Sequence, residues 1–318
     1  MYRKLIKFGE STLVISLPKE WTLRHHLKKG DSVVCEEEND SLLLNPAGQV
    51  RNKEAPQEET RLHFASAEEF KHLLTAAYIR SYPLINVTYD KKNDITDIRE
   101  GVNRFLALEI IQQTAKKVVI KDFLNVQDVD PNDTLRRIDL IIRAMMEDAI
   151  ACMKGEDMAE SVRQKEIDVN RLSNLMFKIL TRALTAQGRR TLDLSIQDVF
   201  YLWEQILFLE KTADQIKRLV RYKDPLPKDT SLIVELLEKS SANYELAMRA
   251  HYKCNLEAAL KMRMGRSAMY KSCDEVHAKL KGTNPVLFEK IKNLNSQIAN
   301  IAANVLKLHP KLNLQQSH

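Results

Sequence analysis

Residues 133–309 carry one helix-type pattern after another, and no other feature constrains the fold as strongly. Apolar side chains recur every three or four positions, as in Leu135, Ile138 and Ile142, which is the spacing of one buried helix face. The chain has only eight Gly and nine Pro in 318 residues, so few positions break a helix. Its breaks predict six helices, at 135–153, 158–186, 193 or 195–222, 229 or 230–252, 256–280 and 285–308.

A proline-rich break divides these helices into two groups of three. Asp224-Pro225-Leu226-Pro227 follows the third helix, and three further helices of similar length come after it. Long helices joined by short turns stack antiparallel into a bundle. We therefore predict a mainly α fold with two three-helix units, 131–223 and 228–309, related by duplication.

The first 46 residues form a separate, strand-rich pattern. One copy of this segment has too few large apolar side chains to close a core, so we expect a homodimer formed by strand exchange. The second strand pair forms a hairpin around Asn39-Asp40. Turn residues predict a short helix at 19–27 and strands at 2–8, 12–17, 32–37 and 41–44.

Basic side chains are concentrated in this first unit. The whole chain has a formal net charge of +6, and its first thirty residues hold seven basic side chains against Glu10 and Glu20. Such a cluster suits nucleic-acid phosphates, and a twofold dimer would bring two sets of cations onto one face. The alternative, a solvated basic face on a dimerisation domain, stays open. The candidate DNA contacts are Arg3, Lys4, Lys7 and Arg24, with Lys19 weaker.

The segment between the head and the helices divides into a linker and a small folded unit. Residues 47–61 are polar, with several Glu, and predict a linker. Residues 62–130 mix helical and strand-like periodicity, which predicts a small α/β connector. Its expected elements are helices at 67–80 and 97–110 and strands at 84–89 and 117–120.

Acidic side chains at helical spacing mark a candidate metal site. Glu210 and Asp214 lie four residues apart on the third predicted helix, and Glu166 and Asn170 have the same spacing on the second, so each pair lies on one helix face. Oxygen ligands of this kind bind a hard cation when a facing helix adds another. Apolar neighbours indicate that Glu210 is partly buried, which favours a paired or metal-bound carboxylate. The alternative, spaced acids on a solvated helix, also stays open.

A second basic run lies on the fourth and fifth predicted helices. Its positive charge fits an anion, a nucleic acid or a partner's acidic patch, and equally an exposed face of the bundle. The run consists of Arg249, Lys253, Lys261, Arg263, Arg266 and Lys271.

The sequence gives no support to several function classes. The four cysteines include no CxxC pair. The chain has no signal-peptide-type start and no 18-residue apolar stretch, so we expect a cytoplasmic protein that is not integral to the membrane. It has no glycine-rich phosphate loop and no nucleophile–base pair, so we expect no enzyme. The remaining enzyme alternative would use a carboxylate-bound metal.

The head resembles the AbrB/SpoVT swapped-hairpin family. Residues 7–21, KFGESTLVISLPKEW, and then Leu27-Lys28-Lys29-Gly30-Asp31 carry that family's strand pair, its SLPKE turn and helix, and its Gly-Asp turn in the same order. The resemblance covers residues 1–46 and implies a DNA-binding homodimer. By position it also implies DNA contacts for Arg3, Lys4, Lys7 and Arg24, and less directly for Lys19.

The helical part resembles the PhoU family of phosphate-uptake regulators, whose fold is two three-helix units. That family's second-helix and third-helix motifs correspond here to residues 168–172, DVNRL, and residues 210–214, EKTAD. Residues 293–297 of the second unit have lost both acids, which leaves the metal site in the first unit. The resemblance implies a divalent or ferric metal ion there, held by Glu210, Asp214, Asp168, Glu166 and Asn170, with Asn170 standing where the family has a carboxylate.

Head, connector and helical units occur together in archaeal phosphate-uptake regulators, which this chain resembles. The connector is similar to theirs at residues 104–110, where the family tends to place Gly at the position of Ala107. The combined resemblance implies a regulator of phosphate homeostasis, whose head docks on operator DNA and whose body senses phosphate status. The alternative is an adaptor that docks on a phosphate-transporter ATPase component or a sensor kinase, and whose head only dimerises.

Overall fold

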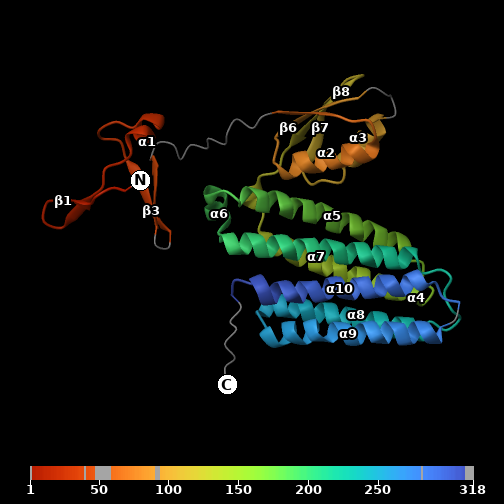
Figure 1. The fold of residues 1–318 in the computed structure, drawn as a ribbon. Helices are drawn as coiled ribbons and strands as arrows, with labels where there is room; N and C mark the ends of the chain where they lie inside the picture. The colour runs from red at the N-terminus through yellow and green to blue at the C-terminus, as the bar shows by residue number, and fades with distance from the viewer. Residues whose placement is uncertain (1, 39–40, 47–58, 90–93, 281, 312–318) are drawn as a thin grey trace. The chain divides into compact units, whose positions relative to one another are not determined.

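A computed structural model describes residues 2–38, 41–46, 59–89, 94–280 and 282–311. The chain divides into two compact units, Met1–Glu58 and Glu59–His318, whose elements are labelled in Figure 1. The predicted hairpin turn Asn39-Asp40 and residues 47–58 of the predicted linker lie outside the described residues.

The first unit contains two antiparallel strand pairs and a short helix. Strand β1 (Ile6–Phe8) pairs with β2 (Thr12–Val14), and β3 (Val33–Glu38) pairs with β4 (Ser41–Pro46). Helix α1 (Lys19–Arg24) starts directly after Pro18, where a proline interrupts no helical hydrogen bond. The elements agree with the predicted order, although β1 and β2 are shorter than the strands predicted at 2–8 and 12–17.

The first unit has almost no core within one chain. Among its described side chains only Pro46 is buried. Burial of apolar surface stabilises a fold by about 25 cal/mol per Å². A single copy of this unit gains little of that stabilisation, because its apolar side chains stay exposed. Its exposed large apolar side chains are Tyr2, Leu5, Ile6, Phe8, Leu13, Val14, Ile15, Leu23, Val34 and Leu42.

The connector is a four-stranded sheet with two helices. The strand order is β5-β6-β8-β7, in which β5 and β6 are parallel and the other neighbours antiparallel. Apolar side chains of both helices pack on the sheet and make one core with it, including Phe70, Leu74, Ile85, Ile98 and Ile120. The elements are β5 (Thr60–His63), α2 (Ala67–Ile79), β6 (Leu84–Thr88), α3 (Asp94–Val102), β7 (Leu108–Gln113) and β8 (Lys117–Asp122).

Two predictions for the connector were wrong. Thr60 and Arg61 belong to strand β5 rather than to the linker at 47–61. The helix predicted at 97–110 ends at Val102, and its last residues form β7 instead. The chain reverses between them, and Ala107 has a φ of 60°, which a residue inside a right-handed helix cannot adopt.

Long helices form the rest of the second unit, close to the predicted bounds. Asp130 and Asn284 cap helices that begin with a proline, and Ser195 forms a capping box with Asp198. No helix in the described part of the chain has the length and apolar character needed to cross a membrane. The helices are α4 (Pro131–Met153), α5 (Ala159–Arg182), α6 (Ala186–Leu192), α7 (Ile196–Arg221), α8 (Ser231–Lys253), α9 (Leu256–Lys279) and α10 (Pro285–Leu308).

The long helices pack in two groups of three. Helices α4, α5 and α7 contact one another, and so do α8, α9 and α10. The groups join where α7 lies along α10 and α4 contacts α8, as Figure 1 shows. One continuous apolar core runs through both groups.

The second predicted helix, 158–186, is divided in the structure. Helix α5 ends at Arg182, and the short helix α6 follows after a turn. Gly188 lies inside α6, where a Cβ atom would stand 2.1 Å from the Arg182 carbonyl oxygen. This glycine therefore permits a close approach of two backbone segments, and it does not mark the helix end that the sequence predicted there.

A buried ion pair joins the connector to the first group of helices. Lys178 of α5 is only 1% exposed, and its Nζ contacts the Asp122 carboxylate at the end of β8. The same ammonium lies 4.3 Å from the centre of the Tyr78 ring on α2. Helix α2 also packs directly against α5, so connector and bundle share an interface at this place.

Candidate functional site

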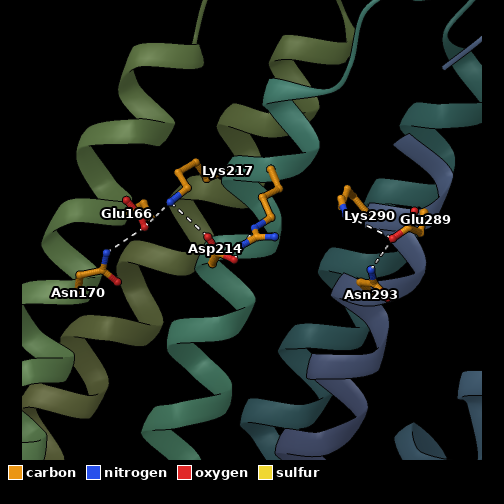
Figure 2. A network of polar contacts seen from close by, with 8 residues as sticks. Glu166, Asn170, Asp214, Lys217, Glu289, Lys290 and Asn293 are labelled. Carbon is orange, nitrogen blue, oxygen red and sulfur yellow. Dashed lines mark hydrogen bonds and ion pairs between the residues drawn. The ribbon is translucent and has the colours of Figure 1, made fainter. Parts of the chain in front are cut away.

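The predicted acidic residues of α5 and α7 meet at a lysine. Lys217 Nζ lies 2.6 Å from Glu166 Oε1 and 3.2 Å from Asp214 Oδ1. Figure 2 shows the ammonium between the two carboxylates, which come from facing helices. Glu166 of α5 and Asp214 of α7 thus share one ammonium group, and the positive charge between them comes from the protein.

Two further groups complete the cluster. Asn170 donates from Nδ2 to Glu166 Oε1 over 2.9 Å, and Arg218 Nε lies 2.7 Å from Asp214 Oδ2. Glu166 is mostly buried, with its side chain 10% exposed, so these partners replace the water that its charge has lost.

Glu210 lies one turn before Asp214 on α7 and is partly buried. Burial raises the pKa of its carboxyl group, and the nearby charges of Asp214 and Glu166 raise it further. Lys211 and Lys217 act in the opposite direction with smaller effect. Glu210 thus belongs electrostatically to the cluster.

Asp168 does not join this cluster. Its side chain is exposed, and it lies 4.0 Å from Arg171 on the same helix. Residues 166 and 170 share one face of α5, whereas position 168 is turned about 200° away from 166 at 3.6 residues per turn.

These side chains do not fit a metal ion as they are arranged. No group of three or more His, Cys, Asp or Glu side chains in the described residues is placed to hold one. Glu166 and Asp214 direct oxygens to the Lys217 ammonium, and Asn170 presents its NH2 group, which is a donor and no ligand. Lys217 was not singled out from the sequence. Its position three residues after Asp214, on the same face of α7, is the one sequence signal that could have predicted the contact between them.

The second three-helix group has an amide network at the predicted counterpart. Asn295 on α10 is fully buried, and its Nδ2 donates to Ser240 Oγ over 2.8 Å and to the Ile291 carbonyl over 2.9 Å. A separate contact on α10 joins Asn293 and Lys290 to Glu289, as Figure 2 shows. Residues 293–297 contain no acid, and the buried Asn295 makes only neutral hydrogen bonds with described residues.

The predicted DNA-contacting side chains all lie exposed on the first unit. Arg3 and Lys4 precede β1, Lys7 lies within it, and Lys19 and Arg24 are the end residues of α1. None of the five forms an ion pair with a described residue. Their charges are therefore available to an external anion.

The second basic run follows the outer side of α8 and α9. Arg249, Lys253, Lys261, Arg263 and Lys271 are exposed, and Arg266 lies over the Tyr270 ring at 5.7 Å. Apart from the 3.9 Å contact of Lys271 with Glu275, no carboxylate of the described residues pairs with them. This arrangement agrees with an exposed bundle face and points to no particular ligand.

Comparison with known proteins identifies no relative. No protein-family model matches the chain, and no curated protein and no solved structure matches it significantly.

Proposed function

We propose that this protein is a DNA-binding regulator of phosphate uptake. Its first unit docks on DNA as a homodimer, and its helical body is the sensing or partner-docking module. The observation that carries the proposal is the first unit itself, where unpaired cations and uncovered apolar strands occur in the same 46 residues.

The uncovered strands support dimer formation. A unit of this size that exposes Phe8, Leu13 and Ile15 gains stability when a second copy covers them. Strand exchange between two copies would do so and would double the number of cations on the DNA-binding face. The resemblance to swapped-hairpin DNA-binding domains agrees with this arrangement.

The test is the salt dependence of DNA binding by the full-length protein. Fluorescence anisotropy with a labelled duplex should show that combined Arg3→Ala, Lys4→Ala and Lys7→Ala substitutions lower the affinity. The slope of log K against log salt should fall by about one unit for each phosphate contact removed. The matched control is Lys261→Ala, Arg263→Ala and Lys271→Ala, which removes the same charge from exposed positions on α9.

Unchanged affinity and slope in the head variant, with the dimer intact, would contradict DNA docking by this face. The adaptor alternative, in which the head only dimerises, would then replace the proposal.

A further inference from the structure

A pocket of about 490 Å³ opens between the connector and the first group of helices. The connector contributes Lys71 of α2 and Arg104 of the turn after α3, and α5 and α7 contribute Glu166, Ser173, Glu210 and Lys217. Its volume falls within the range of small-molecule sites, about 300–1,000 Å³. The Lys217 cluster forms one wall, so the pocket adjoins the candidate site.

The pocket has an excess of positive charge. Lys71, Arg104, Arg163 and Lys217 line it together with the carboxylates of Glu166 and Glu210, so the lining has a formal excess of two positive charges. Because the pKa of Glu210 is raised, its negative charge is the more easily lost of the two.

The uncompensated charges belong to the connector. Arg163 is held by Glu160 through two hydrogen bonds of 2.7 and 2.6 Å, and Lys217 is held by its own carboxylates. Lys71 and Arg104 form no ion pair with any described residue. Two cations from the connector thus face a pocket without a protein partner.

A hydroxyl without a hydrogen-bond partner also belongs to the lining. Ser173 is 2% exposed, and its Oγ has no hydrogen-bond partner among the described residues. Other buried hydroxyls on the long helices donate to the carbonyl four residues earlier, as Thr212 of α7 does to Phe208 and Ser240 of α8 to Leu236. Ser173 does not, and it is one of the residues that line the pocket, so we assign an oxygen of the bound molecule as the partner of its donor.

We propose that this pocket binds a small phosphorylated molecule, whose phosphate contacts Arg104 and Lys71 and accepts a hydrogen bond from Ser173. The planar guanidinium of arginine suits two phosphate oxygens at once. A phosphate monoester carries about 1.5 to 2 negative charges near neutral pH, which is opposite in sign and similar in size to the charge of Lys71 and Arg104 together. The volume exceeds the needs of a phosphate alone, and Phe105, Ile167 and Phe177 give the rest of the molecule an apolar wall.

This inference rests on the proposed function, because it names the ligand class that the sensing body would take. A ligand that contacts Arg104 and Ser173 would bridge the connector and α5, which the Lys178–Asp122 ion pair also joins. Its binding would therefore stabilise the interface between these two parts of the second unit.

The experiment is isothermal titration calorimetry of the full-length protein with inorganic phosphate, AMP, ATP and glucose 6-phosphate, and with citrate as a carboxylate anion. At least one phosphorylated probe should bind more tightly than citrate. Arg104→Gln and Lys71→Gln should each weaken that binding tenfold or more. Arg80→Gln is the matched control, because Arg80 is an exposed connector residue that does not line the pocket, and it should leave the affinity unchanged.

Ser173→Ala separates a ligand contact from a structural role. It removes an unpaired buried hydroxyl, so it should raise the Tm of the free protein while weakening the bound probe three- to tenfold. The proposal is wrong if no phosphorylated probe binds at millimolar concentration, if citrate binds equally well, or if the Arg104 and Lys71 variants bind like the wild type. Because no DNA is present, these results leave the test of DNA docking independent.

Discussion

At the scale of single residues, Lys217 decides what the acidic cluster can bind. A metal ion between Glu166 and Asp214 would balance their charges, and the Lys217 ammonium already does so from distances of 2.6 and 3.2 Å. A lysine in this place makes the neutralisation permanent and independent of metal supply. A metal ion and the Lys217 ammonium cannot occupy the same space between the two carboxylates. Removal of the lysine therefore tests whether a metal ion can take its place.

Replacing Lys217 by alanine should make the stability of the protein dependent on metal. Without added metal, Lys217→Ala should lower the free energy of unfolding by about 1–3 kcal/mol, because the buried Glu166 loses its charged partner. Mg²⁺ or Mn²⁺ should then raise the Tm of the variant, because the freed carboxylates can bind it, and should leave the wild type unchanged. Lys261→Ala, at an exposed position of α9, is the control. A wild-type Tm that falls on addition of EDTA would contradict this interpretation.

The raised pKa of Glu210 should make the protein less stable as the pH rises. Its pKa is raised in the folded protein by burial and by Asp214 and Glu166, so the folded state binds a proton more tightly than the unfolded state does. The protein then loses stability as the pH rises from the ordinary carboxyl pKa through the raised one. Glu210→Gln should remove this loss.

Urea unfolding across the pH range measures the effect. The Glu210→Gln variant should be more stable than the wild type at neutral pH, and the difference should vanish at acidic pH, where the carboxyl is protonated in both states. Glu100→Gln, on an exposed face of α3, should show no such trend. Destabilisation of Glu210→Gln at neutral pH would mean that the ionised carboxylate has a favourable partner after all.

At the scale of elements, helix and strand bounds were predicted best from the sequence where residues within one turn determine them. The start of α10 was predicted from Asn284-Pro285, because proline fits the first helical position, and the helix begins at Pro285. Strand β7 was missed because residues 104–110 have apolar spacing that fits a helix, and only pairing with β8 decides otherwise. The i, i+4 acids were found by spacing, but the meeting of Lys217 with Glu166 depends on how α5 and α7 pack, and so does the position of Ser173.

Gly188 and Gly265 both lie inside helices, but they differ in the space that a side chain would have. A Cβ at Gly188 would meet the Arg182 carbonyl oxygen at 2.1 Å, whereas one at Gly265 in α9 meets nothing within 4 Å. Gly188→Ala should therefore destabilise the protein by about 1–3 kcal/mol through overpacking. Gly265→Ala should stabilise it by about 0.5–1 kcal/mol, because alanine favours the helix interior. Guanidinium unfolding of both variants checks the signs, and equal signs would show that the turn between α5 and α6 has room to adjust.

At the scale of the whole molecule, the two units differ in how they are stabilised. The second unit buries continuous apolar cores within one chain. The first leaves nearly all of its described side chains uncovered. If a second copy covers the first unit, as we propose, dimer formation and the folding of this unit should be a single event.

A charged substitution in β2 tests that coupling. Leu13 is 61% exposed, and a change at an ordinary exposed position alters stability by less than about 0.5 kcal/mol. If a second copy covers this strand, Leu13→Asp should instead place a charge in an interface and lower the molar mass seen by light scattering from dimer to monomer. Met264→Asp is the matched control, because Met264 is 79% exposed on α9, and it should leave the mass of the dimer unchanged. A monomeric wild type, or a Leu13→Asp variant that keeps the dimer mass, would show that β2 stays uncovered, and DNA docking by a paired head would then lose its structural basis.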